Sequence, residues 1–292
     1  MTDTINSLLL DPEDSRALLA SLLSGLPCLL EGPPGIGKTE TAKAIAQYLN
    51  RPLTRIQCTS DTLPSDVVGY TKINPVDGSS QMIRGPLFGD FILVDEINRA
   101  PPSTQSAFLE GMAEQQVTVE GKTLALPPHQ NIVATQNPLE DHGTHPLPRS
   151  QLDRFAVRVQ MTYPETGVEA NIIAGVPVER ETIITKQSID QLKEQLSIVT
   201  LPENSLQYIM TIIDRSRSDG FWSTGLSTRA GLILKQVAQG LAAIDESEVI
   251  HLKHVQDAFL ATAPHRLLPP DTGTQEHRDT HQTWLHQIPF PV

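Results

Sequence analysis

The sequence predicts an α/β fold, in which a parallel sheet flanked by helices is followed by a small all-helical domain. Between residues 27 and 161, short apolar runs alternate with segments of helical spacing, which is typical of a parallel sheet covered by helices. Beyond residue 164, nearly every segment has helical spacing. The 292 residues suit about two domains. We expect the sheet domain over residues 1–163, the helical domain over 164–266 and a C-terminal tail over 267–292.

Each element follows from its local pattern. The expected strands are the apolar runs 28–30, 53–58, 91–94, 131–135 and 155–161. Helices are expected at 39–49, 189–196, 205–216, 227–243 and 252–262. Residues 117–126 alternate in polarity around Glu120 and Gly121, which predicts a β-hairpin insertion in the sheet domain. Residues 69–85 are polar and contain glycine, which predicts a second projecting loop or hairpin. Residues 264–292, rich in Pro, Thr and His, are expected to be extended or disordered.

Composition limits the classes of partner. The net charge of -12 and an aromatic content of 4% argue against broad attraction to nucleic acid or anionic membranes, so a protein partner is expected. The longest apolar stretch, residues 17–30, is interrupted and too short to span a bilayer. The acidic start lacks the positive region of a signal peptide, which predicts a cytoplasmic protein without membrane insertion. Cys28 and Cys58 lie in strand-like runs and are expected to be buried, reduced thiols.

A glycine-rich loop lies between the first expected strand and the first expected helix. It fits the pattern G-x-x-x-x-G-K-[ST], whose backbone N–H groups surround a phosphate while the following helix directs its positive end at the same anion. Lys38 would reach the β and γ phosphates of ATP, and Thr39 would hold Mg²⁺. The alternative is an ordinary Gly/Pro turn. The expected nucleotide-binding residues are Gly32, Pro33, Pro34, Gly35, Ile36, Gly37, Lys38, Thr39 and Glu40.

Polar side chains follow two further expected strands. Asp95 and Glu96 come directly after the apolar run 91–94, at the edge where α/β sheets bind ligands. Asp95 would support Mg²⁺ through its water shell, and Glu96 would polarise the water that attacks the γ phosphate. Asn137 follows the run 131–135 and could bind the γ phosphate or that water. The alternatives are a solvated strand end for the two acids and a turn-starting role for Asn137.

These motifs together resemble those of the AAA+ ATPases, and among them the MoxR family. The resemblance lies in GPPGIGKT, in DEINRAPP within residues 85–112, in ATQNP, in LPRSQLDRF and in GLSTRA, and it covers residues 20–266. It implies a P-loop core with hairpin insertions and a helical lid, assembled as a ring, usually hexameric, with ATP bound between neighbouring subunits.

The resemblance also implies roles for two arginines. Arg154 looks like the arginine finger that one subunit offers to the nucleotide of the next, and Arg229 looks like the sensor arginine of the lid. A guanidinium supplied across an interface stabilises transition-state charge. The alternatives are an ion pair for Arg154 and a solvated helix position for Arg229. Arg149 stands where relatives have an acidic residue, and Arg99 could act at the subunit boundary or in a structural ion pair.

The resemblance implies a Mg²⁺-dependent ATPase that acts as a chaperone or remodeller of protein clients, in complex maturation or in metal or cofactor insertion. It also implies a partner with a von Willebrand factor A domain. One alternative is a metal-chelatase-like motor subunit, and another is a DNA-acting motor related to MCM. The hairpin region 117–126 carries one Lys and one Glu, which disfavours DNA. A scaffold that binds ATP without turnover is disfavoured by Glu96.

Overall fold

The computed structural model describes residues 10–128, 130–138, 143–175, 188–269 and 278–291. Among these, residues 29–154 and 160–175 form one compact unit, and residues 10–28, 155–159 and 188–291 form the other. Residues 10–28 therefore belong to the same compact unit as the C-terminal helices. The domain boundaries predicted at residues 163 and 266 stay a prediction. No helix in the described part of the chain is both long and apolar enough to cross a membrane.

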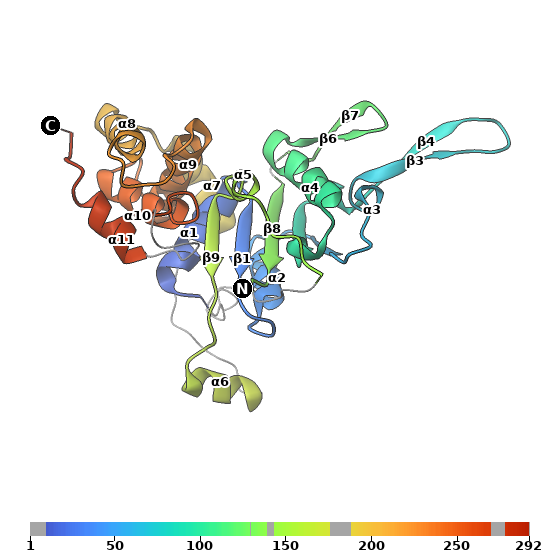
Figure 1. The fold of residues 1–292 in the computed structure, drawn as a ribbon, viewed down its shortest axis with the longest axis horizontal. Helices are drawn as coiled ribbons and strands as arrows, with labels where there is room; N and C mark the ends of the chain where they lie inside the picture. Colours follow the sequence, from blue (N-terminus) through green and yellow to red (C-terminus); the bar gives the residue numbers. More distant parts are fainter. Residues whose placement is uncertain (1–9, 129, 139–142, 176–187, 270–277, 292) are drawn as a thin grey trace. The chain divides into compact units, whose positions relative to one another are not determined.

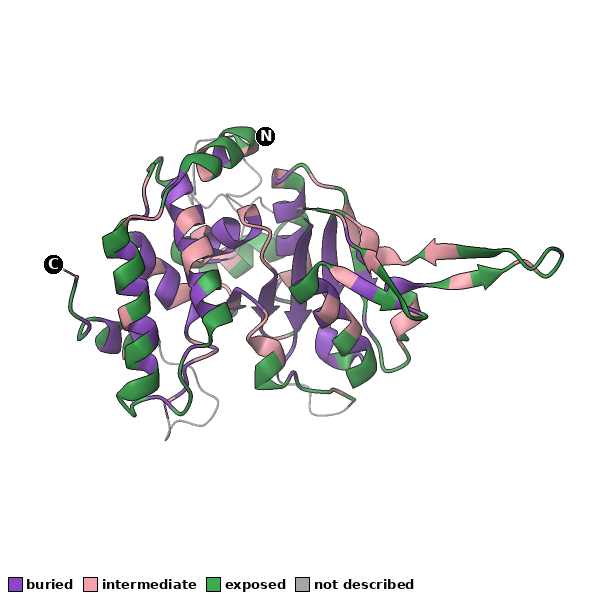
Figure 2. Ribbon diagram, turned by 90° about the horizontal axis from the view of Figure 1, so that it is seen from above, coloured by how far each residue is buried: buried purple, intermediate pink, exposed green. Residues whose placement is uncertain are grey.

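A five-stranded sheet has the strand order β2-β5-β8-β1-β9 (Figure 1). Parallel pairing joins β2 to β5 and β5 to β8. Every residue of β1, β5 and β8 is buried, and Figure 2 shows the central strands in purple, the colour of burial. Burial on both faces explains why these strands are continuous apolar runs. The strands are β1 (Cys28–Glu31), β2 (Leu53–Gln57), β5 (Phe91–Asp95), β8 (Asn131–Gln136) and β9 (Val157–Gln160), which confirms the predicted fold class.

Helices and short turns connect these strands. Helix α4 begins with Pro102. Proline suits a first helical position because the N–H group that it lacks would have no partner within the helix there. The helix buries Phe108, Leu109 and Met112. The connecting elements are α2 (Lys38–Tyr48), α3 (Pro64–Val68), the 3₁₀ turns Pro86–Phe88 and Ile97–Arg99, α4 (Pro102–Glu114) and α5 (Arg149–Leu152). Helix α6 (Thr166–Ile173) follows β9. The helix predicted at 39–49 is therefore α2, shifted by one residue.

Two hairpins are inserted in the first unit and extend away from the sheet (Figure 1). One is β3 (Gly69–Ile73) with β4 (Ser80–Arg84), and the other is β6 (Gln116–Val119) with β7 (Lys122–Ala125). Glu120 and Gly121 between β6 and β7 both have positive φ angles, 49° and 77°, as the two central residues of a type I′ turn require. The hairpin predicted at residues 117–126 is confirmed, and the insertion at 69–85, predicted as a loop or a hairpin, is a hairpin.

The second unit is helical. It contains α1 (Pro12–Leu23), α7 (Ile189–Ile198), α8 (Glu203–Ser218), α9 (Thr228–Ile244) and α10 (Leu252–Thr262), so the four predicted C-terminal helices are confirmed. Ser227 caps α9 by accepting the N–H of Ala230 at 3.0 Å. Helices α1 and α9 approach so closely that a Cβ on Gly240 would lie 2.5 Å from the carbonyl oxygen of Ala20.

The expectation of an extended or disordered segment from residue 264 onward is wrong for residues Arg278–Leu285, which form helix α11. His281 and Trp284 are buried, and their rings lie 4.7 Å and 5.5 Å from the ring of Trp222. The indole N–H of Trp284 donates to Asp219 at 2.5 Å. The polar composition of the segment concealed a few aromatic residues at helical spacing, which bury enough apolar area to hold the helix in place.

Candidate active site

The glycine loop has the backbone shape that a phosphate site needs. Gly37 has φ 91° immediately before α2, and a Cβ on Gly32 would lie 2.4 Å from the carbonyl oxygen of Met161, so neither position suits a larger residue. The Lys38 ammonium donates to the carbonyl oxygens of Gly32 and Pro33 at 2.6 Å and 2.7 Å. The loop thus holds its cation beside the N-terminus of α2, where an anion is favoured.

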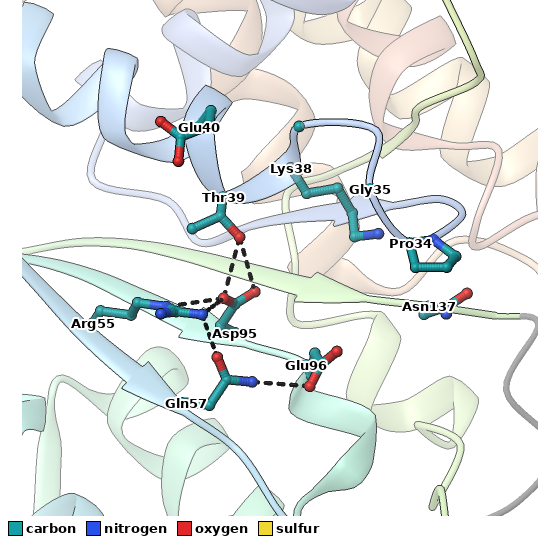
Figure 3. Close-up of a pocket in the computed structure, with 11 residues that line it drawn as sticks. Pro34, Gly35, Lys38, Thr39, Glu40, Arg55, Gln57, Asp95, Glu96 and Asn137 are labelled. Atoms are coloured by element: carbon teal, nitrogen blue, oxygen red, sulfur yellow. Dashed lines mark hydrogen bonds and ion pairs between the residues drawn. The ribbon is translucent and has the colours of Figure 1, made fainter.

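The loop forms one wall of a cavity of about 370 Å³, a size typical of small-molecule sites (Figure 3). Six of the nine predicted nucleotide-binding residues line it: Pro34, Gly35, Gly37, Lys38, Thr39 and Glu40. The opposite wall comes from strand ends and contains Arg55, Gln57, Asp95, Glu96 and Asn137. Of the three predicted residues outside the lining, Ile36 is buried, whereas Gly32 and Pro33 contribute the carbonyl groups that bind Lys38.

Asp95 accepts more hydrogen bonds than the other acids of the cavity, and it is buried, with 5% of its surface exposed. Its Oδ1 accepts the hydroxyl of Thr135 at 2.6 Å. Its Oδ2 accepts the hydroxyl of Thr39 at 3.1 Å and the Nε and Nη2 groups of Arg55 at 3.0 Å and 2.6 Å. Thr39 and Asp95 therefore bring two hard oxygen donors together from the helix start and the strand end, a donor set that suits Mg²⁺.

Glu96 begins the turn after β5 in a left-handed conformation, with φ 57° and ψ 50°. Such a conformation costs a non-glycine residue about 1–3 kcal/mol and persists where the surroundings impose it. Its backbone N–H donates to the Thr135 hydroxyl at 2.9 Å. Its Oε2 accepts Gln57 Nε2 at 2.9 Å and Arg99 Nη1 at 3.2 Å. These bonds hold the carboxylate at the cavity wall, and they place Arg99 in an ion pair within its own chain.

Arg55 and Gln57 belong to the site and were missed by the sequence analysis. Both lie on β2, which pairs with β5 so that Gln57 is opposite Asp95. Arg55 binds Asp95, and it also donates to Gln57, which in turn donates to Glu96 (Figure 3). Their polar character near the end of a strand indicates the site only when β2 is known to pair with β5, because polar residues there reach the same sheet edge.

Cys58 directly follows Gln57 in the chain. Burial, with the negative charges of Asp95 and Glu96, raises the pKa of the Cys58 thiol to about 12. The thiol therefore stays protonated at neutral pH and does not act as a nucleophile. Cys28 and Cys58 are both free and buried, which confirms the prediction of reduced thiols.

Asn137 lies where β8 leaves the sheet and lines the cavity, opposite Lys38 (Figure 3). It is buried, and its carbonyl oxygen accepts Asn98 Nδ2 at 3.1 Å. The bond ties the end of β8 to the turn that follows Glu96. The structure thus brings the loop, both carboxylates and Asn137 together around one cavity.

The predicted arginines lie outside this cavity lining. Arg154 is half-buried, and its Nη1 donates to the carbonyl oxygen of Leu109 at 2.7 Å. Arg149 begins α5 and is exposed. Arg229 is exposed in the first turn of α9 and belongs to the other compact unit. As whole residues, Arg149 and Arg229 are exposed and Arg154 is half-buried, so none of the three is fully enclosed by its own chain.

Two protein-family models match two separate parts of the chain. Residues 27–157 match the model of the ATPase family associated with various cellular activities, AAA. Residues 215–283 match the model of the AAA lid domain. The second match reaches into helix α11, beyond the predicted end of the lid at residue 266.

Relatives cover most of the chain. YeaC, an uncharacterized protein of Bacillus subtilis, is 36% identical over 270 residues, which are 90% of this chain and 84% of the relative. Chaperone MoxR1 of Mycobacterium tuberculosis is 31% identical, over 86% of this chain and 70% of its own length. The crystal structure of a candidate ATPase from Cytophaga hutchinsonii superposes with a TM-score of 0.78 at 30% identity, covering 95% of this chain and 89% of that one.

Proposed function

Because the chain belongs to the MoxR family of AAA+ ATPases, we propose that it assembles into a hexameric ring and uses Mg²⁺-dependent ATP hydrolysis to remodel a protein client. The chain is an ATPase, and one of its relatives is named as a chaperone. The observation that supports the location of its active site is that the glycine loop, Thr39, both carboxylates and Asn137 line a single cavity.

In the proposed reaction, the loop binds the phosphates through its backbone N–H groups and Lys38. Lys38 then exchanges its two carbonyl partners for phosphate oxygens. Thr39 and Asp95 would hold Mg²⁺, which when bound neutralises charge on the phosphate oxygens. The carboxylate of Glu96 orients the attacking water and accepts its proton, and the amide of Asn137 binds the γ phosphate or that water.

The transition-state charge needs a further cation at the γ phosphate. We assign that role to Arg154 of a neighbouring subunit, with Arg229 as the sensor of the lid. The partial exposure of Arg154 and the exposure of Arg229 support this assignment. Hydrolysis would then depend on assembly, because each cavity is completed by another copy of the chain.

The client is proposed to be a protein. One relative is named as a chaperone, and another, from Pseudomonas aeruginosa, as the denitrification regulatory protein NirQ. The net charge of -12 also disfavours a nucleic-acid client. We propose a cytoplasmic location and a partner with a von Willebrand factor A domain, in complex maturation or in metal or cofactor insertion.

A variant that traps ATP tests this function. Glu96→Gln retains the shape of the side chain but cannot accept the proton, so it should bind ATP without turning it over and accumulate as rings on sedimentation analysis. Tagged Glu96→Gln with ATP and Mg²⁺ should capture a von Willebrand factor A protein and leave single-stranded DNA unbound. Capture of DNA instead, or turnover by Glu96→Gln at the rate of the original protein, would contradict the proposal.

A further inference from the structure

Arg55 has no part in the reaction described above, although it makes the strongest contact with the proposed metal carboxylate. Its Nη2 lies 2.6 Å and its Nε 3.0 Å from Asp95 Oδ2. Arg55 and Asp95 come from neighbouring strands, β2 and β5, so the pair is fixed by the register of the sheet. A guanidinium with two donors on one carboxylate is a strong and directional partner.

The bonds that Asp95 Oδ2 accepts occupy the lone pairs of that oxygen, so a metal ion that binds there competes with Arg55. An oxygen of an ionised carboxylate offers about two lone-pair sites. Oδ2 already receives two N–H groups of Arg55 and is the nearer oxygen to the Thr39 hydroxyl, at 3.1 Å, whereas Oδ1 receives the Thr135 hydroxyl and lies 3.4 Å from the Thr39 hydroxyl. Thr39 and Asp95 are the two residues that would hold Mg²⁺. Arg55 therefore uses the carboxylate edge that faces the other proposed metal ligand.

The Arg55 side chain is also tied to the general base. It donates to the side-chain oxygen of Gln57, and Gln57 Nε2 donates to Glu96 Oε2 at 2.9 Å. One guanidinium therefore connects the metal carboxylate with the acid that would activate water (Figure 3). A cation that takes Asp95 from Arg55 also withdraws the donor that orients Gln57 and, through it, Glu96.

We propose that Arg55 is a positioning residue that competes with Mg²⁺ for Asp95 and so makes the orientation of Glu96 depend on metal binding. Two cations repel each other at one carboxylate, and the second must displace the first or weaken its bond. The Arg55 side chain is 47% exposed, so water can solvate its guanidinium when that group leaves Asp95. The proposal rests on the nucleotide site assigned above.

The test follows binding rather than turnover. A fluorescent ATP analogue at fixed, sub-saturating concentration is titrated with Mg²⁺ from an EDTA-containing start, with the full-length protein and its Arg55→Gln variant. Loss of the competing cation should lower the half-saturating Mg²⁺ concentration by roughly three- to tenfold, as expected for one half-exposed, charge-assisted contact. Arg55→Lys should give an intermediate shift, because an ammonium keeps the charge but lacks the two-pronged geometry.

Arg51→Gln is the matched control, because it makes the same charge change just before β2, outside the cavity lining. Thermal unfolding and the affinity measured in EDTA separate a folding defect from a change in metal binding. A half-saturating Mg²⁺ concentration for Arg55→Gln that rises, or that equals the value for Arg51→Gln, overturns the proposal. Absence of Mg²⁺-ATP binding by the original protein contradicts the proposed function itself, which is a separate result.

Discussion

Lys38 illustrates how one side chain can matter for a ligand and little for the fold. Its ammonium donates to two carbonyl oxygens of the loop, those of Gly32 and Pro33, at 2.6 Å and 2.7 Å. Water can replace such contacts with little loss of folding free energy, whereas a phosphate loses a direct positive charge. The residue is therefore expected to act on binding.

Replacing Lys38 by Ala should reduce ATP affinity by at least about a hundredfold, as the loss of a charge-assisted phosphate contact predicts. The unfolding temperature should change little. Isothermal titration calorimetry and thermal unfolding measure the two effects. Lys43→Ala on the same helix removes the same charge from an exposed ion pair with Glu40, and should leave ATP affinity nearly unchanged. Equal affinities for the two variants would refute the role of Lys38.

At the same scale, the sequence predicted the two carboxylates that line the cavity but not their partners. Asp95 and Glu96 were predictable because two acids after four buried apolar residues have no role in a hydrophobic core. Arg55 and Gln57 were not, because nothing along the chain says that β2 pairs with β5 in the register that puts Gln57 opposite Asp95. Spatial pairing of strands is a tertiary property, so the network of Figure 3 needs the structure.

Among the elements, strands and helices with strong apolar patterns were predictable, and weakly patterned ones were not. Strands β1, β5 and β8 are buried along their whole length, so their sequences carry a clear signal. Helix α11 has a polar sequence, RDTHQTWL, and its stability depends on the contacts of Trp284 and His281 with Trp222. Those contacts are distant in sequence, which is why local composition gave the wrong expectation.

The contact between α1 and α9 gives a prediction at this scale. Gly240→Ala places a methyl group 2.5 Å from the Ala20 carbonyl oxygen, so the helices must separate. The free energy of unfolding should fall by about 1–3 kcal/mol, the usual cost of overpacking. Chemical denaturation measures the change. Gly167→Ala in α6 meets no atom within 4 Å and should be neutral or slightly stabilising. An equally stable Gly240→Ala protein would show that this helix contact is not close-packed in solution.

For the whole molecule, His265 links stability to pH. It is fully buried, and its Nε2 lies 3.1 Å from the Phe155 carbonyl oxygen. Burial, and then the nearby cation of Arg266, lower its pKa well below 6.5, with smaller contributions from Arg158 and His281. Below pH 6.5 the unfolded chain therefore binds a proton that the folded chain does not, so the stability present above pH 6.5 is lost as the pH falls.

The expected result is an unfolding free energy that decreases between pH 6.5 and 5, by up to about 1.4 kcal/mol per pH unit from this group. His265→Gln should flatten part of that slope in urea denaturation at several pH values. His254, whose pKa is also lowered by burial, should account for part of the remainder. His286→Gln, at an exposed position, should keep the full slope. An unchanged slope in His265→Gln would mean that His265 is not held neutral in the fold.

The central claim at this scale is that each active site is completed by a second copy of the chain. In the proposed assembly, one subunit would supply the glycine loop, Asp95 and Glu96, and its neighbour would supply Arg154. The half-buried position of Arg154, bound to a backbone carbonyl oxygen rather than to the cavity, is compatible with such a role. Subunits with different defects should therefore repair one another.

Mixing Arg154→Ala with Glu96→Gln protein tests this most directly. Each variant alone should bind ATP and hydrolyse it slowly, and in mixed rings the intact arginine of Glu96→Gln should serve the intact cavity of Arg154→Ala. The matched control replaces Glu96→Gln by the double variant Glu96→Gln, Arg154→Ala, which offers no arginine. The account predicts that ATPase activity rises several-fold on mixing in the first case and stays at the sum of the parts in the control. Mixed rings with no gain over the control would contradict it.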